Sequence, residues 1–237
     1  MKPLFRSFMM FVRQIFKDSM LAAVCGAAVL TALFVRFGVP AAESALCGYF
    51  GKTAILKDYY LLFDLMLMTV TPYLLLFASA MMMLTEIDEN LSNYLAVTPV
   101  GKSGYMASRL LIPAAIALIV SVALTAWFSL THWPLWALLS GCLIASLAST
   151  AGALMMVSFS RNRVEGMAMG KLSGLIMLGL FAPFFLPGGA KYLLSPLPSL
   201  WLAEFSRTQN ALLLIPALAA SALWLMLLYR KFDKKIA

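Results

Sequence analysis

Residues 110–160 contain no Asp, Glu, Lys or Arg, so fifty-one consecutive residues carry no charged side chain. About 20 apolar residues, each rising 1.5 Å along an α-helix, cross the hydrocarbon core of a bilayer. This stretch is therefore long enough for two membrane-spanning helices, with a turn between them at residues 132–134. The chain is predicted to be a membrane protein.

Uncharged, apolar windows of similar length recur along the rest of the chain. They are Ser19–Val35, Leu65–Thr85, Leu110–Thr131, Trp133–Ser160, Leu172–Ala190 and Thr208–Tyr229. Charged residues make up 12% of the chain, against about a quarter in soluble domains. The windows lack the alternation of a barrel strand, and a helix satisfies its backbone groups within the segment. The sequence predicts an all-α, polytopic fold, with one domain of six transmembrane helices over residues 19–237.

The basic residues indicate the orientation of these spans, because Lys and Arg favour cytoplasmic loops. Six spans place both termini on one side of the membrane. Thirteen basic residues fall on that side: Lys2, Arg6, Arg13, Lys17, Lys102, Arg109, Arg161, Arg163, Lys171, Arg230, Lys231, Lys234 and Lys235. Only Arg36, Lys52, Lys57, Lys191 and Arg207 fall on the other side. Both termini are predicted to be cytoplasmic, and the net charge of +8 requires no nucleic-acid partner.

Residues 1–18 are predicted to form an amphipathic helix in the membrane interface. Lys2, Arg6, Arg13 and Lys17 fall on one arc of a helical wheel, and apolar residues fill its other side. Such a helix contacts lipid with its apolar face and anionic head groups with its basic face. It is either a plain anchor for the first span or a lever that couples the spans to a cytoplasmic partner. A cleaved signal peptide is the alternative, but the leader is long for one.

The segment from Glu86 to Arg109 is the most distinctive part of the cytoplasmic side. As a helix, its first half places Glu86 and Glu89 on one face and apolar residues on the other, until Pro99 disfavours helix at Thr98. Three of the ten acidic residues of the chain lie here. They form either a docking surface for a basic partner or a set of charges that stabilises a helix N-terminus.

In this segment the chain resembles the type-2 ABC transporter permeases, the membrane subunits of many bacterial exporters. The matching residues are Asp88-Glu89, Val97-Thr98-Pro99, Lys102 and Arg109. Asn90-Leu91-Ser92 stands where that family has Gly-Thr-Leu. The wider plan also agrees, with an interfacial leader, six spans and an apolar outer loop.

The resemblance implies an export permease of the bacterial cytoplasmic membrane that forms a translocation path for a drug-like, lipid-like or small peptide substrate. Two ABC ATPase subunits, which carry ATP and Mg, push on the coupling loop 86–109, and a second permease subunit, identical or related, completes the path. The coupling residues are Glu86, Asp88, Glu89, Tyr94, Thr98, Pro99 and Lys102. The resemblance also implies short re-entrant helices in the outer region 187–207. Pro196 and Pro198 bar a continuous helix there.

Two further sets of residues in the spans are of interest. Asp64, with Met68 and Thr71 further along the same face, is a candidate for the substrate path, because an acidic residue in a span is costly and often functional. Its position near the outer end of the span leaves solvation as the alternative. Gly166, Gly170 and Gly174 recur every fourth residue, which allows another helix to approach closely.

No residue pattern indicates catalysis, a cofactor or a metal on this chain. Residues 96–103 match a permissive P-loop pattern, but Pro99 removes a backbone N–H that phosphate binding needs, and no strand precedes it. Cys25, Cys47 and Cys142 have no metal-ligand spacing, and no disulfide is expected. The alternative to an ATP-driven permease is a self-contained secondary transporter or channel, which would show internal repeats and charges at mid-span. A membrane enzyme is the least favoured class.

Overall fold

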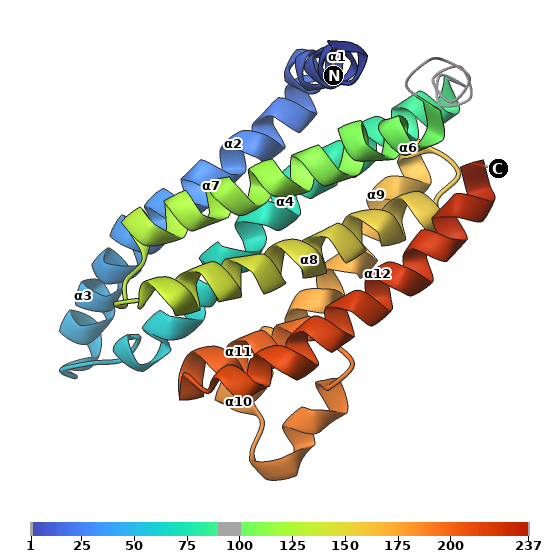
Figure 1. Cartoon of the computed structure of the whole chain (residues 1–237). Coiled ribbons are helices and arrows are strands. Elements are labelled where there is room, and N and C mark those ends of the chain that lie inside the picture. Colours follow the sequence, from blue (N-terminus) through green and yellow to red (C-terminus); the bar gives the residue numbers. More distant parts are fainter. Residues whose placement is uncertain (1, 90–100, 237) are drawn as a thin grey trace.

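The computed structural model describes residues 2–89 and 101–236, and its regular structure there is helical, with no strand (Figure 1). The α-helices are α1 (Lys2–Lys17), α2 (Ser19–Leu33), α3 (Val39–Phe50), α4 (Tyr60–Asp88), α6 (Gly101–Met106), α7 (Ile112–Phe128), α8 (Leu135–Phe159), α9 (Arg163–Ser173), α10 (Ala182–Phe185), α11 (Pro198–Thr208) and α12 (Leu214–Ile236). Shorter 3-10 or π-helical elements are η1 (Phe34–Gly38), η2 (Lys57–Tyr59), η3 (Ala107–Leu111), η4 (Gly174–Leu180), η5 (Gly188–Leu194) and η6 (Ala211–Leu213). The all-α prediction is confirmed.

Five helical runs in the described residues are long and apolar enough to cross a membrane. They are Ser19–Phe50, Lys57–Asp88, Gly104–Phe128, Leu135–Phe159 and Ala211–Asp233. Each of them contains or overlaps one of the predicted windows. The first is longer than predicted: the helical run continues past Arg36, whose guanidinium donates to the backbone carbonyl of Ser129 at 3.1 Å.

The remaining window, Leu172–Ala190, is not one continuous helix. The chain passes there through the end of α9, then η4, α10 and the start of η5. A Cβ on Gly179 would lie 2.5 Å from the backbone nitrogen of Leu200, so η4 and α11 touch backbone to backbone. Pro183 lies in the first turn of α10, and Pro187 precedes η5. The expectation of an unbroken helix was wrong here because tight packing and prolines divide the segment, and a sixth crossing stays a prediction.

The outer region 187–207 is folded into two short helices, η5 and α11. The break between them falls at residues 195–197, next to the prolines that predicted it. Trp201 holds the break, since its indole N–H donates to the carbonyl of Ser195 at 2.8 Å. Most of α11 is buried in the bundle. Whether these helices re-enter the membrane stays a prediction.

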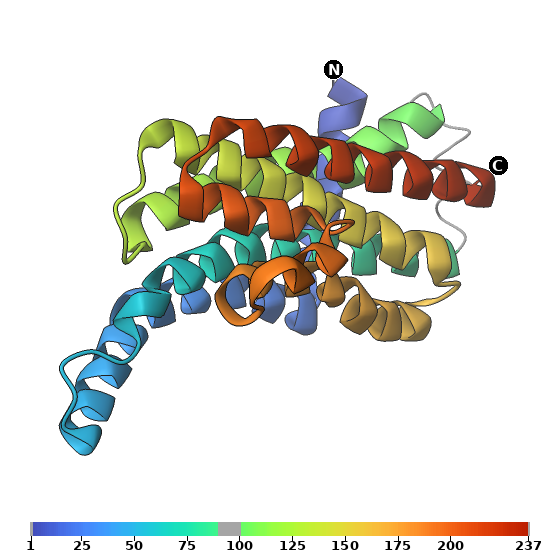
Figure 2. The same ribbon diagram turned by 90° about the horizontal axis from the view of Figure 1, so that it is seen from below.

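Helices α4 and α8 form the centre of the bundle. Seventeen residues of each are buried, and α4 packs against α2, α7, α8 and α9, while α8 also packs against α12. Helix α1 crosses one end of this bundle at a steep angle, and α3 projects from the opposite end (Figures 1 and 2). Helix α1 and the end of α12 lie at the end of the bundle where α4 stops and α6 begins (Figure 1). That end contains the predicted coupling segment.

Candidate coupling site

The coupling segment is described on both sides of a gap. Tyr94, Thr98 and Pro99 lie outside the described residues, and for Lys102 only its position in α6 is described. Glu86, Asp88 and Glu89 close α4. The geometry that follows therefore concerns the two flanks of the loop and what they contact.

A buried ion pair joins these flanks. Arg109 in η3 donates from Nη2 to Oε1 of Glu86 at 2.7 Å, and from Nε to both carboxylate oxygens at 3.1 Å. The two side chains are 4% and 2% exposed. A planar guanidinium that meets a carboxylate with two nitrogens forms one of the strongest charged contacts in proteins. The pair fixes the end of α4 against the start of the third span.

The same guanidinium also holds the N-terminal helix. Its Nη1 donates to the carbonyl oxygen of Ser7 at 3.0 Å and to the Ser7 hydroxyl at 2.8 Å. The centre of the guanidinium lies 4.7 Å from the ring centroid of Phe11, a cation–π distance. Phe11 is itself 1% exposed. One arginine thus binds α1 and α4 together.

A proline explains why the backbone at Arg109 is open to a further contact. In a regular α-helix the carbonyl of Arg109 would accept from the N–H of residue 113, but Pro113 has none. The chain forms the π-helical turn η3 here, and the buried hydroxyl of Ser79 on α4 donates to the Arg109 carbonyl. We call Ser7, Phe11, Ser79, Glu86 and Arg109 the Arg109 joint.

The joint corrects the role predicted for Glu86. Glu86 is 1% exposed and its carboxylate is occupied by Arg109, so it is not available to a docking partner. Asp88 and Glu89, the next acidic residues, are exposed. The acidic segment therefore divides into a buried residue that holds the bundle together and an exposed pair beside the gap.

A second, more exposed contact lies at the same end. The guanidinium of Arg163, at the start of α9, contacts Asp18 at 2.5 Å, and its backbone N–H donates to Asp88 at 3.0 Å. Asp18 also caps α2, accepting from the N–H groups of Met20 and Leu21. The hydrogen bond from Arg163, with those from the two N–H groups, lowers the pKa of Asp18 below its ordinary value of 3.8 against the opposing effect of burial. Arg163 thus connects α2, α4 and α9.

Asp64, the acidic candidate for the substrate path, is fully buried and is not solvated as the alternative expected. Its carboxylate accepts from the backbone N–H groups of Leu130 and Thr131 at 2.7 and 2.8 Å, from the Thr131 hydroxyl, and from the Trp133 indole at 3.2 Å. Four donors satisfy the charge without any ligand. Asp64 therefore fixes the turn between α7 and α8.

The other two path candidates are also inside the bundle. Met68 is fully buried, with its sulfur close to Gly141 of α8. Thr71 is fully buried too. The structure brings the three together along α4, and none of them lines the small cavity described below. Their role in transport stays a prediction.

The glycines at every fourth position face α4. A Cβ on Gly166 would collide with the end of the Leu84 side chain, and one on Gly170 would lie 2.6 Å from the Phe77 ring. The space at Gly174 is less tight, with the Tyr73 hydroxyl at 3.6 Å. These three glycines, which we call the glycine stripe, thus let α9 lie close to α4.

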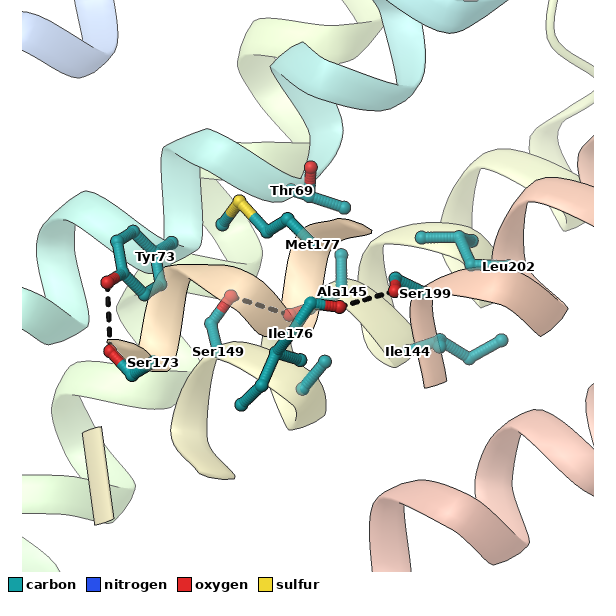
Figure 3. A pocket seen from close by; sticks show the side chains of 11 residues that line it. Thr69, Tyr73, Ile144, Ala145, Ser149, Ser173, Ile176, Met177, Ser199 and Leu202 are labelled. Carbon is teal, nitrogen blue, oxygen red and sulfur yellow. Dashed lines mark hydrogen bonds between the residues drawn. The ribbon is translucent and has the colours of Figure 1, made fainter. Parts of the chain in front are cut away.

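Next to the glycine stripe, a cavity of only about 10 Å³ lies between α4, α8, η4 and α11 (Figure 3). This is room for about one water molecule. The hydroxyl groups around it bond to neighbouring protein groups: Tyr73 contacts Ser173 at 2.9 Å, and Ser199 donates to the carbonyl of Ile176 (Figure 3). The cavity is a packing feature and is too small for a transported molecule.

The sequence did not single out most of the residues that form this site. Arg109 appeared only as part of a motif, and Ser7, Ser79, Asp18 and Arg163 had no assigned role. One signal was present: Arg109 is the last charge before fifty-one uncharged residues, and Glu86 is the first charge after the apolar window of α4. Charges at the edges of spans that face a bundle usually pair with each other.

The helical bundle and its five long apolar helices are those of a helical membrane protein. The chain belongs to the family described as "Fluoroquinolones export permease protein Rv2686c-like", which it matches over residues 11–230. The chain is therefore an export permease, and its resemblance to type-2 export permeases is confirmed. No curated protein and no solved structure matches it.

Proposed function

We propose that this chain is the membrane subunit of an ATP-driven ABC exporter in the bacterial cytoplasmic membrane. Two ATPase subunits, which carry ATP and Mg, supply the energy, and a second permease subunit completes the translocation path. The family description suggests the substrate class, planar aromatic drugs of the fluoroquinolone type. The motif of residues 88–109 supports the ATPase partner.

The proposed topology has six crossings with both termini in the cytoplasm. The five long helices supply five crossings, and the consecutive elements α9, η4 and α10 supply the sixth. The thirteen basic residues of the terminal side support this orientation. Helix α1 then lies in the cytoplasmic interface, at a steep angle to the spans (Figure 2).

The observation that carries the proposal is the Arg109 joint. The loop on which an ATPase would push connects α4 to α6, and the joint binds the end of α4, the start of the third span and α1 to one guanidinium. A displacement of the loop is then transmitted to three elements together. Mechanical coupling needs such a connection between the loop that the ATPase would push and the helices that cross the membrane.

Transport by the purified proteins tests the proposal. The chain is purified in mild detergent from its native source, the bound ATPase is identified by mass spectrometry, and the pair is reconstituted into vesicles with a fluorescent fluoroquinolone. We expect drug movement that requires ATP and both proteins. Movement by this chain alone, driven by an ion gradient without ATP, would overturn the proposal in favour of a secondary transporter.

The exposed acidic residue next to the gap tests where the ATPase docks. Glu89→Lys reverses a charge beside the loop, and we expect it to reduce recovery of the ATPase at least tenfold. Asp58→Lys makes the same change at the opposite end of the same helical run, where the side chain is also exposed, and should leave recovery unchanged. Equal recovery with both variants would place the docking surface elsewhere.

A further inference from the structure

A groove of about 300 Å³ lies beneath α1, at its junction with the bundle. One wall is the apolar side of α1, and the others come from α2, α4 and α7. The lining is apolar apart from the Cys25 thiol and the Ser79 hydroxyl, and that hydroxyl already donates to the Arg109 carbonyl. The groove therefore suits a slender apolar ligand and offers little to a polar one.

The faces of α1 show which ligand fits. Phe11, Ile15, Met9 and Phe16 all line the groove; Phe11 and Ile15 are buried, whereas Met9 and Phe16 remain 51% and 65% exposed. Arg13 lies on the same side of the helix as these two residues, within about 60° of both on a 3.6-residue wheel. Its side chain is exposed. A positive charge thus adjoins the apolar groove.

Arg6 and Lys17 extend this charge along α1. They fall on the same arc as Arg13, and both are exposed. An acyl chain in the groove would place its head group beside this basic arc, where a phosphate and a net negative charge are favoured. Charge complementarity thus selects an anionic phospholipid over a zwitterionic one, and the small volume of the groove favours an acyl chain over a protein helix.

We propose that this groove binds one acyl chain of an anionic phospholipid from the leaflet in which α1 lies, with the head group held by Arg13. The proposal does not require the ATPase. It does have a consequence for the Arg109 joint, because Phe11 and Ser79 belong both to the groove and to the joint. A bound chain would brace α1 against the bundle and hold the joint closed.

Native mass spectrometry tests the groove with a matched pair of variants. Ile116 on α7 lines the groove, and Ile119, one turn further along, does not; both are partly exposed. After exposure to equal amounts of phosphatidylglycerol and phosphatidylcholine, we expect the wild type and Ile119→Trp to retain one phosphatidylglycerol. Ile116→Trp fills the groove and should retain at least tenfold less. Comparing the variants removes lipid bound elsewhere on the chain.

A second pair tests the head group. Arg13→Gln should abolish the preference for phosphatidylglycerol over phosphatidylcholine, whereas Arg230→Gln, an exposed arginine on α12, should retain it. Thermal unfolding of each variant checks that the bundle is intact. Equal retention by Ile116→Trp and Ile119→Trp, or an unchanged lipid preference in Arg13→Gln, would overturn the proposal.

Discussion

Helix α4 carries two buried carboxylates, and they are stabilised in different ways. Asp64, near the start of the helix, accepts from two backbone N–H groups and two side chains of the turn that joins α7 to α8. Glu86, near its end, is paired with the Arg109 guanidinium, which also binds α1. Both residues are at most 1% exposed. The first part of α4 is thus fixed by hydrogen bonds from a turn, and its last part by an ion pair.

The two contacts differ in the number of separate elements that they connect. The partners of Asp64 are donors of one short turn, so the contact fixes a local shape. The partners of Arg109 come from α1 and α4, and the Ser79 hydroxyl binds its carbonyl, so the contact fixes elements that are far apart in the sequence. A change at Asp64 should therefore weaken one end of the bundle, and a change at Arg109 should uncouple several elements.

Arg109→Met tests this comparison with the largest expected effect. It leaves the Glu86 carboxylate buried without its cation, and breaking a buried ion pair costs about 3–5 kcal/mol of folding free energy. We expect a large fall in the thermal unfolding temperature of the purified protein and loss of ATP-driven transport. Tryptophan fluorescence during heating measures the first, and vesicle uptake measures the second.

The double variant Glu86→Leu with Arg109→Met is the control for this experiment. It removes both charges, and replacing a buried pair by apolar residues is often neutral for stability. We expect stability to recover while transport stays low, since α1 is no longer bound to η3. Full recovery of transport would show that the joint holds the fold but does not couple it.

Asp64→Asn should have a smaller effect. The amide keeps one acceptor oxygen but places an NH₂ group against donors, and a hydrogen bond to a charged group contributes about 1.5–3 kcal/mol. We expect unfolding at a lower temperature and an unchanged ratio of transport rates for two different fluoroquinolones. A changed ratio would instead place Asp64 in the substrate path.

Most of the fold could be predicted from the sequence because apolar windows report directly on burial in a bilayer. Five of the six windows correspond to long helices. The exception, Leu172–Ala190, is also uncharged and apolar, but hydropathy carries no information on whether a helix is continuous. Its division depends on Pro183 and Pro187, and on the contact of Gly179 with Leu200, which is twenty-one residues away in the sequence.

Less of the site could be predicted, because its residues come from distant segments. The sequence assigned Glu86 to the surface of the predicted coupling segment, since a helical wheel does not show which polar face meets another part of the chain. The partner is twenty-three residues away and the Ser7 contact a hundred and two. Pro113 was the local signal that the carbonyl of Arg109 needed another donor.

Between Asp64 and Glu86, α4 is held by packing against the glycines of α9 and η4, so glycine substitutions test a contact that involves no charge. Gly166→Ala adds a methyl group that meets Leu84, and overpacking costs about 1–3 kcal/mol. Gly174→Ala adds the same group with the nearest atom at 3.6 Å and should change stability by less than about 0.5 kcal/mol. Chemical denaturation of both variants measures the difference. Equal effects would show that α9 does not depend on this close approach to α4.

The contact between Asp18 and Arg163 should show the smallest effect, because it is more exposed than the Arg109 joint. Arg163 lowers the pKa of Asp18, so the folded state binds this proton more weakly than the unfolded state. The contribution is fully present above pH 3.8 and is lost as the pH falls through the lower folded pKa. We expect Asp18→Asn to lower stability by about 1 kcal/mol or less at pH 7 and to approach the wild type in acid. Unfolding temperatures of the two proteins from pH 7 to pH 3 measure this, and a difference that does not shrink in acid would assign the effect to the α2 cap alone.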